Sequence, residues 1–493
     1  MNSPFSSTVM STRLLNYRPG VTIVVAGLTI LAAKYAANLS AGRMSGALAT
    51  LAAMPREQAF AYIAVLVVAL VVFMVKPFAG ALLLLVALPL ESMLPSLKLA
   101  GALLFAVWFI RRLVRNEPWK PLLSGPYVVV ATVFIAYVFA SSVWAVNSSA
   151  AFRGVIQLSL LFAWSLLFVD LVRSWERAEL LAKLLVVSGT VAAVLTLGQS
   201  SAGAIRAGNL ITGQVNGTAL MLLAIMPFAF YLLRGCRGML WRALGLAFVA
   251  LAVAAVALTL SRMGLLLLPA VLAILLWQTV RGKRGRALLI PLIALGLFGL
   301  ARFVPWDRLE NRLDTVPQYV ETLLRPDNQA LSEYSGRGYH IRVAMEIGRD
   351  HPIIGAGYNS YGQLFIEEYQ YSVPGAPGFW RQYRSPHSSW PGIFADLGVV
   401  GLTLWAVVLG VVLTSVWKAW SRTRNRGDVR HHFFVQATIV SFLLYIGPYS
   451  LYVPVEKEKL LWALLGLSIA LGTLAREPEP GVLPLERGGG RRG

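Results

Sequence analysis

Long apolar runs, separated by short segments rich in arginine and lysine, constrain the fold of this chain more than any other feature. Hydrophobic residues make up 57% of its 493 residues, and charged residues only 14%. Soluble domains carry roughly 25% charged residues, so this chain has too few to cover a soluble surface. It is therefore predicted to be an integral membrane protein. Because backbone in a bilayer core must satisfy its own hydrogen bonds, the apolar runs are predicted to be helices.

The predicted fold class is an all-α polytopic membrane protein with about 14 (12–14) transmembrane helices and one large helical periplasmic loop. The predicted spans lie at about 21–40, 58–75, 77–94, 97–113, 124–146, 152–172, 178–198, 214–233, 239–260, 263–280, 287–303, 391–416, 433–453 and 459–475.

The distribution of basic residues predicts the orientation. With the N-terminus in the cytoplasm, the inside segments hold 26 of the 44 basic residues, as the positive-inside rule requires. The chain then divides into five parts. Residues 1–20 form a cytoplasmic N-terminal segment, residues 21–303 hold helices 1–11, and residues 304–390 form a large periplasmic loop subdomain. Residues 391–475 hold helices 12–14, and residues 476–493 form a basic cytoplasmic tail. With both termini in the cytoplasm, the long loop faces the periplasm or the exterior.

Charge and cysteine content narrow the partners further. The net charge is +21, and the basic residues that produce it lie in short loops between apolar runs. We therefore expect the lipid bilayer as a partner and no nucleic acid. The single Cys236 excludes an internal disulfide and a cysteine metal cluster. Arg13 and Arg18 before the first apolar run also resemble a signal peptide, whose cleavage would leave the downstream orientation unchanged.

Three polar residues stand out at predicted outer ends of helices. Arg206 lies in a Gly/Ser-rich loop, Arg262 lies in a very short turn between two apolar helices, and His387 ends the long polar segment. A charge placed close to hydrocarbon is costly and usually functional, although an arginine can also extend to the lipid headgroups. His387 could equally cap or hydrogen-bond a helix start, and Arg206 could be a solvated loop residue.

The long loop has a distinctive composition. Between Ala301 and Pro386 it holds nine arginines and no lysine, together with ten acidic residues. Arginine offers a planar fork for phosphate or carboxylate, although ordinary surface ion pairs explain most of these residues. Its second half is rich in tyrosine and tryptophan, which pack on sugar rings or lie at membrane interfaces.

Several motifs occur in a fixed order. They are the turn Ser261–Gly264, then Gly336-Arg337 leading a helix into Asp350–Gly357, then His387-Ser388-Ser389 and Phe394–Gly398. Together with the Arg206–Asn216 stretch, this order resembles the O-antigen ligase and O-antigen polymerase superfamily of bacterial envelope membrane glycosyltransferases. The resemblance covers about 200–420.

The resemblance implies that a glycan moves from an undecaprenyl-diphosphate carrier to a periplasmic acceptor, either lipid A–core or another lipid-linked repeat. Arg206 and Arg262 would stabilise the departing diphosphate, and His387 would act as the base, so the anomeric centre would be inverted. No metal and no cofactor are expected. The residues predicted to bind substrate are Asn216, Ser261, Arg337, Arg342, Tyr358, Trp390 and Asp396.

Some features depart from the family pattern. Met263 occupies a position that is often small, and Gln214-Val215-Asn216 replaces a common Asn-Pro-Asn. A count of fourteen helices exceeds the twelve typical of ligases. A repeat-unit polymerase, a protein O-glycosyltransferase and, from another class, a polysaccharide transporter or flippase therefore stay open. A transporter would need ionisable residues near the midplane, for which Lys34 and Glu91 are the few candidates.

Overall fold

A computed structural model describes the regions in which most of the predicted helices lie. These regions are residue 67 and residues 70–90, 96–201, 207–208, 214–236, 238–279, 314, 317, 336–370, 372 and 385–476. All of them except Val67 belong to one compact unit, Ala69–Gly493. Outside the described residues lie the predicted segments 1–20, 21–40 and 287–303, the larger part of 58–75, most of the loop before Gly336, and the tail after Arg476.

The described residues form helices joined by short connections and include no strand, which confirms the all-α prediction for this part of the chain. The α-helices are α4 (Pro77–Ala87), α5 (Ser96–Val114), α6 (Lys120–Leu123), α7 (Pro126–Ser141), α8 (Ser148–Leu171), α9 (Trp175–Ser201), α11 (Val215–Gly235), α12 (Met239–Leu258), α13 (Arg262–Thr279), α18 (Gly336–Asp350), α19 (Tyr361–Leu364), α20 (Ser389–Asn425), α21 (Val429–Ile446) and α22 (Lys459–Leu474). The short elements are the 3-10 helices η2 (Leu88–Leu90), η5 (Pro448–Leu451) and η6 (Val455–Lys457), and the π-helical turn η3 (Phe365–Tyr369).

Six described helices are long and apolar enough to cross a membrane: α8, α9, α11, α12, α20 and the segment Val429–Leu451 that contains α21. Four shorter apolar helices, α4, α7, α13 and α22, coincide with further predicted spans. The multi-pass membrane architecture is thereby supported. The total of fourteen spans stays a prediction, because several of the predicted runs lie outside the described residues.

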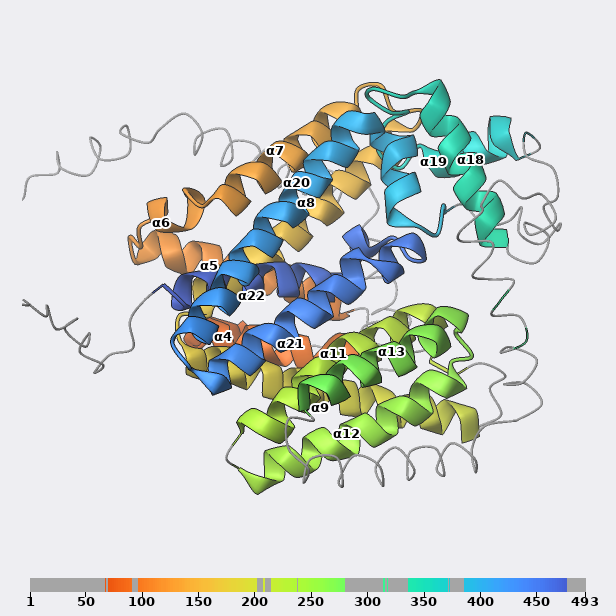
Figure 1. The fold of residues 1–493 in the computed structure, drawn as a ribbon. Helices are drawn as coiled ribbons and strands as arrows, with labels where there is room; N and C mark the ends of the chain where they lie inside the picture. Colours follow the sequence, from red (N-terminus) through yellow and green to blue (C-terminus); the bar gives the residue numbers. More distant parts are fainter. Residues whose placement is uncertain are drawn as a thin grey trace, which may run out of the picture. The chain divides into compact units, whose positions relative to one another are not determined.

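Helix α11 is the most enclosed of the candidate spans, because 94% of its 18-residue apolar stretch is buried. It packs against α9, α12, α13 and α21 (Figure 1). On α21, the Ser441 hydroxyl donates to the Ala224 carbonyl of α11 at 2.6 Å, which fixes these two helices at a buried point. A second group contains α20, α22, α7 and α8, in which α22 contacts both α8 and α20.

Helix α20 is broken near its start, and the loop after α18 is fitted into the break. Gly398 adopts φ 63° and ψ −166°, a conformation that favours glycine. The amides of Val399 and Val400 donate to the carbonyls of Pro352 and Ile353 at 2.9 and 3.2 Å instead of to their own helix. In return, the amides of Ala356 and Gly357 donate to the carbonyls of Ala395 and Asp396 at 3.0 and 2.8 Å.

The two glycine-containing motifs of the sequence therefore pair with each other. A Cβ on Gly398 would lie 2.3 Å from the Ile353 carbonyl oxygen, and a Cβ on Gly355 would lie 2.3 Å from the Leu397 amide nitrogen. Both glycines also have positive φ values. Only a residue without a side chain lets the loop backbone approach the broken helix so closely.

Gly398→Ala is expected to lower the thermal unfolding midpoint of the purified protein and to reduce its yield from membranes. Strained backbone and the clash with the loop together are expected to cost at least ~2 kcal/mol. Gly410→Ala in the same helix is the matched control, because nothing lies within 4 Å of a Cβ placed there. Equal unfolding midpoints for the two variants would contradict this account of the break.

Candidate functional site

His387 lies at the end of the long loop, two residues before α20 begins. It is half-buried and adopts φ 51°, which is unusual for a residue with a side chain. Its backbone amide lies 3.3 Å from the Ser385 hydroxyl, and its ring centroid lies 5.7 Å from that of His340. The backbone is thus held in a strained turn that fixes the direction in which the imidazole leaves the chain.

His340 supports His387 from α18. Its ring is fully buried, and its Nδ1 lies 2.9 Å from the Tyr361 hydroxyl. The apolar face of α18, formed by Tyr339, Val343 and Ile347, is buried in the same cluster as Phe365. The helix predicted to lead from Gly336-Arg337 into Asp350 is therefore present, and His340 lies buried on it.

Asp396 organises the backbone of the adjoining loop. Its Oδ2 accepts a hydrogen bond from the Asn359 amide at 2.8 Å, and its Oδ1 accepts one from the Tyr361 amide at 2.9 Å. The side-chain amide of Asn359 donates in turn to the Ala150 carbonyl of α8 at 3.1 Å. Since both carboxylate oxygens bind loop amides, Asp396 holds the loop in place as well as facing the adjoining cavity.

A polar cavity of about 480 Å³ opens beside these residues. Ser385 and Pro386, which directly precede His387, form part of its wall. Two cationic and two acidic side chains line it, together with amide and tyrosine side chains: Arg153, Lys457, Asp396, Glu456, Gln157, Asn359, Tyr358 and Tyr361. The lining is rich in hydrogen-bonding groups while its formal charges balance, which suits a ligand that carries many hydroxyl groups.

Arg262 is the first residue of α13 and is half-buried. The turn that the sequence placed at Ser261–Gly264 ends at Ser261, whose hydroxyl caps the helix by accepting from the Gly264 amide at 3.3 Å. A helix N-terminus disfavours a cation but stabilises an anion, through both the dipole and its amide groups. An arginine at this position is therefore well suited to share an anionic ligand with the helix end.

Arg206 lies outside the described residues. The next residue, Ala207, donates its amide to the Leu258 carbonyl at 3.1 Å and packs against Leu260. Thr218 on α11 donates to the Gly208 carbonyl at 2.6 Å. The chain directly after Arg206 is thus fastened to the turn that precedes Arg262.

The loop between α21 and α22 joins the neighbourhoods of Asn216 and His387. Its Tyr452 hydroxyl donates to the side-chain oxygen of Asn216 at 3.4 Å. Its Ser450 accepts from the Trp390 indole at 2.7 Å through the hydroxyl, and from the Ser388 hydroxyl at 3.2 Å through the carbonyl. Predicted site residues that are far apart in sequence therefore meet through one short connection.

The remaining predicted residues occupy various positions. Tyr358 is buried and lines the cavity, and its amide donates to the Ser141 hydroxyl at 3.2 Å. Burial raises the pKa of the Tyr358 phenol well above its ordinary value, so it stays a neutral donor. Arg342 is half-buried on α18, which packs against α20. Arg337 begins the same helix, and its side chain lies outside the described part of the structure.

Sequence reasoning missed several residues of the cavity wall, among them Lys457, Glu456 and Asn359. Lys457 Nζ lies 3.0 Å from the Asn359 side-chain oxygen and 5.5 Å from the centroid of the Tyr358 ring. Glu456 accepts from the Ser389 hydroxyl at 2.6 Å and is 5% exposed. The available signal was the charged run Glu456–Lys459, which interrupts two apolar segments at a predicted outer turn.

Glu456 is expected to make stability depend on pH. Burial raises the pKa of its carboxyl above the ordinary value, so the folded state binds a proton more tightly than the unfolded chain. The resulting contribution to stability is present below the unfolded pKa, near pH 4.5, and is lost as pH rises through the raised folded value. Thermal unfolding of the wild type and Glu456→Gln should therefore be compared across this range.

Between mildly acidic and neutral pH, the unfolding midpoint of the wild type should fall relative to that of Glu456→Gln. Glu368→Gln is the control, because Glu368 is exposed on η3 and has no place in the cavity wall. Parallel pH profiles for the wild type and Glu456→Gln would contradict the assignment.

Within the described residues, no group of three or more histidine, cysteine, aspartate or glutamate side chains is arranged to hold a metal ion. The chemical groups that the described residues offer are an imidazole beside a cavity of balanced formal charge, and a guanidinium at the start of α13.

A family model described as O-antigen ligase matches residues 246–406. No curated protein matches the chain. The matched segment includes Arg262, the Asp350–Gly357 loop, His387 and the break in α20, so it contains most of the geometry described above. The match confirms the predicted resemblance to the O-antigen ligase and polymerase superfamily, and it supports a membrane glycosyltransferase.

Proposed function

We propose that this chain, as a membrane glycosyltransferase of the O-antigen ligase and polymerase superfamily, transfers a glycan from an undecaprenyl-diphosphate carrier to a periplasmic acceptor. The acceptor in the ligase case is lipid A–core. Two observations within the matched segment carry the proposal: His387 lies beside a cavity lined by hydrogen-bonding groups, and Arg262 lies at a helix N-terminus.

His387 acts as the base in this proposal. Its neutral imidazole accepts the proton of an acceptor hydroxyl as that oxygen attacks the anomeric carbon of the donor glycan. The new carbon–oxygen bond forms on the face opposite the diphosphate, so the configuration at the anomeric carbon is inverted. The strained turn at His387 and its contact with the buried His340 ring support a fixed imidazole orientation.

Arg262 stabilises the leaving group, with Arg206 as its proposed partner. As the bond between the anomeric carbon and the diphosphate oxygen breaks, the electron pair stays with that oxygen and negative charge grows on the diphosphate. A guanidinium and the amide end of α13 supply positive charge there, close to the depth of lipid headgroups. A lipid diphosphate is already a good leaving group, so neither a general acid nor a metal is required.

The cavity of about 480 Å³ receives the sugar-bearing part of a substrate. Its balanced formal charges favour hydroxyl groups over a free phosphate. Lys457 and Asn359 are already hydrogen-bonded to each other, so they present a preorganised polar wall. Phosphate recognition and sugar recognition are thereby assigned to different parts of the site.

The test is the envelope glycan profile of a deletion strain, complemented with wild type or with a His387 variant. Long chains that accumulate on the lipid carrier but are missing from lipid A–core would support the ligase assignment. Loss of long chains with single repeats retained would favour a repeat-unit polymerase of the same superfamily. An unchanged profile would overturn the transferase proposal and return attention to a polysaccharide transporter.

A further inference from the structure

A second cavity, of about 390 Å³, lies between α4, α5 and the end of α8. Six basic side chains line it: Lys76, Arg111, Arg112, Arg115, Arg173 and Arg177. Its two acidic side chains, Glu117 and Asp170, leave a formal excess of four positive charges. The cavity beside His387, in contrast, is lined by equal numbers of cationic and acidic side chains.

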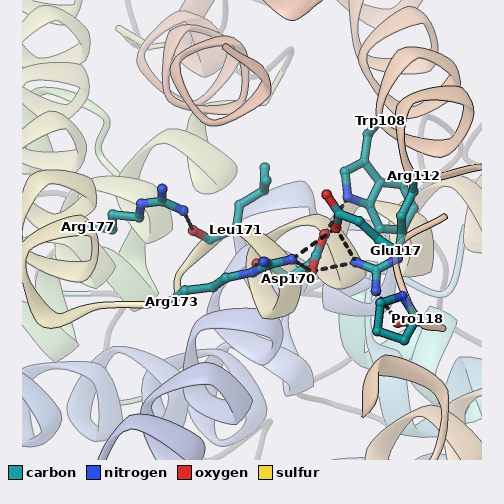
Figure 2. A network of polar contacts seen from close by, with 8 residues as sticks. All are labelled: Trp108, Arg112, Glu117, Pro118, Asp170, Leu171, Arg173 and Arg177. Carbon is teal, nitrogen blue, oxygen red and sulfur yellow. Dashed lines mark hydrogen bonds and ion pairs between the residues drawn. The ribbon is translucent and has the colours of Figure 1, made fainter. Parts of the chain in front are cut away.

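The buried carboxylate of Asp170 lies in the wall of this second cavity. Figure 2 shows its polar contacts. Asp170 accepts from the Trp108 indole at 2.8 Å and pairs with Arg112 and Arg173 at 2.6 and 2.5 Å. The side chains of Arg112 and Asp170 are 5% and 8% exposed. The Glu117 carboxylate lies 3.5 Å from Arg112 and 3.3 Å from Arg173. The carboxylates of Asp170 and Glu117 therefore pair with the same two guanidinium groups.

The other four basic side chains have no carboxylate partner among the described residues. Arg111 donates to the carbonyls of Met74 and Val75, both at 3.0 Å, and Arg177 donates to that of Leu171 at 2.8 Å. Lys76 and Arg115 are exposed. Backbone carbonyls orient two of these cations without neutralising them, so the cavity keeps its positive charge.

The position of the cavity indicates a membrane surface. Asp170 and Ala150 lie at opposite ends of α8, about 30 Å apart along the helix, which matches the thickness of a bilayer core. Ala150 lines the cavity near His387, so the basic cavity lies at the other membrane face. Exposed apolar side chains adjoin it, including Met74, Val75 and Val114.

We propose that this basic cavity binds a phosphate group carried by an anionic molecule at the membrane face opposite the transfer site. Guanidinium groups match phosphate oxygens in geometry and charge. The lipid-facing apolar side chains beside the cavity suit the acyl chains of a phospholipid, whose headgroup would enter between α4 and α5. A water-soluble phosphate shares this chemistry, and the experiment separates the two sources.

The test uses the full-length protein in detergent, titrated with dioctanoyl phosphatidylglycerol, dioctanoyl phosphatidylcholine or inorganic phosphate while thermal unfolding is followed. The variant Lys76→Gln/Arg115→Gln removes two exposed cations from the cavity wall. The matched control is Lys418→Gln/Arg424→Gln, which removes two exposed cations near the C-terminal end of α20, outside this cavity. Arg115→Gln alone serves as a milder second variant.

The cavity variant is expected to bind phosphatidylglycerol at least about tenfold more weakly than wild type, while the control variant binds as wild type. The same pattern with inorganic phosphate would support the site and assign it to a soluble phosphate. Equal weakening in both double variants would overturn the proposal in favour of a general surface charge. Equal affinity for phosphatidylcholine would overturn it in favour of acyl-chain binding alone. No saturable binding of any probe to wild type would also overturn it.

Discussion

His387→Asn is expected to abolish glycan transfer while the protein still inserts and folds. Removing the base should lower the rate at least ~10²-fold, and up to ~10⁴-fold, because the acceptor hydroxyl then has no proton acceptor. Asparagine is chosen because it tolerates the positive φ of 51° better than alanine does. The measurement is the rate at which a lipid-linked glycan is transferred by purified protein.

His351→Asn is the matched control for this variant. His351 is exposed after α18 and takes no part in the cavity wall, so its replacement should leave transfer near the wild-type rate. The unfolding midpoint and the affinity for the lipid-linked donor should be measured for both variants. If His387→Asn transferred the glycan at the wild-type rate, the base would have to be another residue.

Arg262→Ala and Arg262→Lys are both expected to lower the transfer rate, by ~10²- to 10³-fold for the alanine variant. Lysine keeps the charge but lacks the planar fork that can bind two phosphate oxygens at once, so it should restore only part of the rate. The loss should appear in the catalytic rate more than in donor affinity, because the charge on the leaving group grows in the transition state.

Arg349→Ala and Arg349→Lys provide the comparison. Arg349 lies exposed in the last turn of α18, so its replacement removes one arginine from the same matched segment of the chain without touching α13. Full activity of Arg262→Lys together with loss in Arg262→Ala would show that charge alone suffices. Full activity of both Arg262 variants would remove this residue from the mechanism.

The helices were predictable because lipid leaves the backbone few alternatives. The predicted spans 152–172, 214–233 and 239–260 correspond closely to α8, α11 and α12. The end of α20 was less predictable, since the helix continues to Asn425 through polar residues beyond the apolar run. Apolar length identifies where a helix crosses, but it does not report how far the helix continues into water.

The candidate site was predictable only in its parts. His387, Arg262 and the two glycine motifs could be identified in the sequence. No local pattern indicates that the segment around Gly355 contacts the segment around Gly398. No motif in the sequence marks Glu456 and Lys457 as site residues, although they line the cavity. Their role depends on contacts with Ser389 and Asn359, which are more than sixty residues away.

The sequence by itself determined the helical membrane class, the superfamily resemblance and the residue types available for chemistry. These follow from apolar length, charge distribution and short motifs, which are local properties. The tertiary structure decided that the Asp350–Gly357 loop completes the broken start of α20, and that Asp170 gathers two arginines into a basic cavity. Such pairings are set by hydrogen bonds and steric fit between distant segments, so they exist only once the chain has packed.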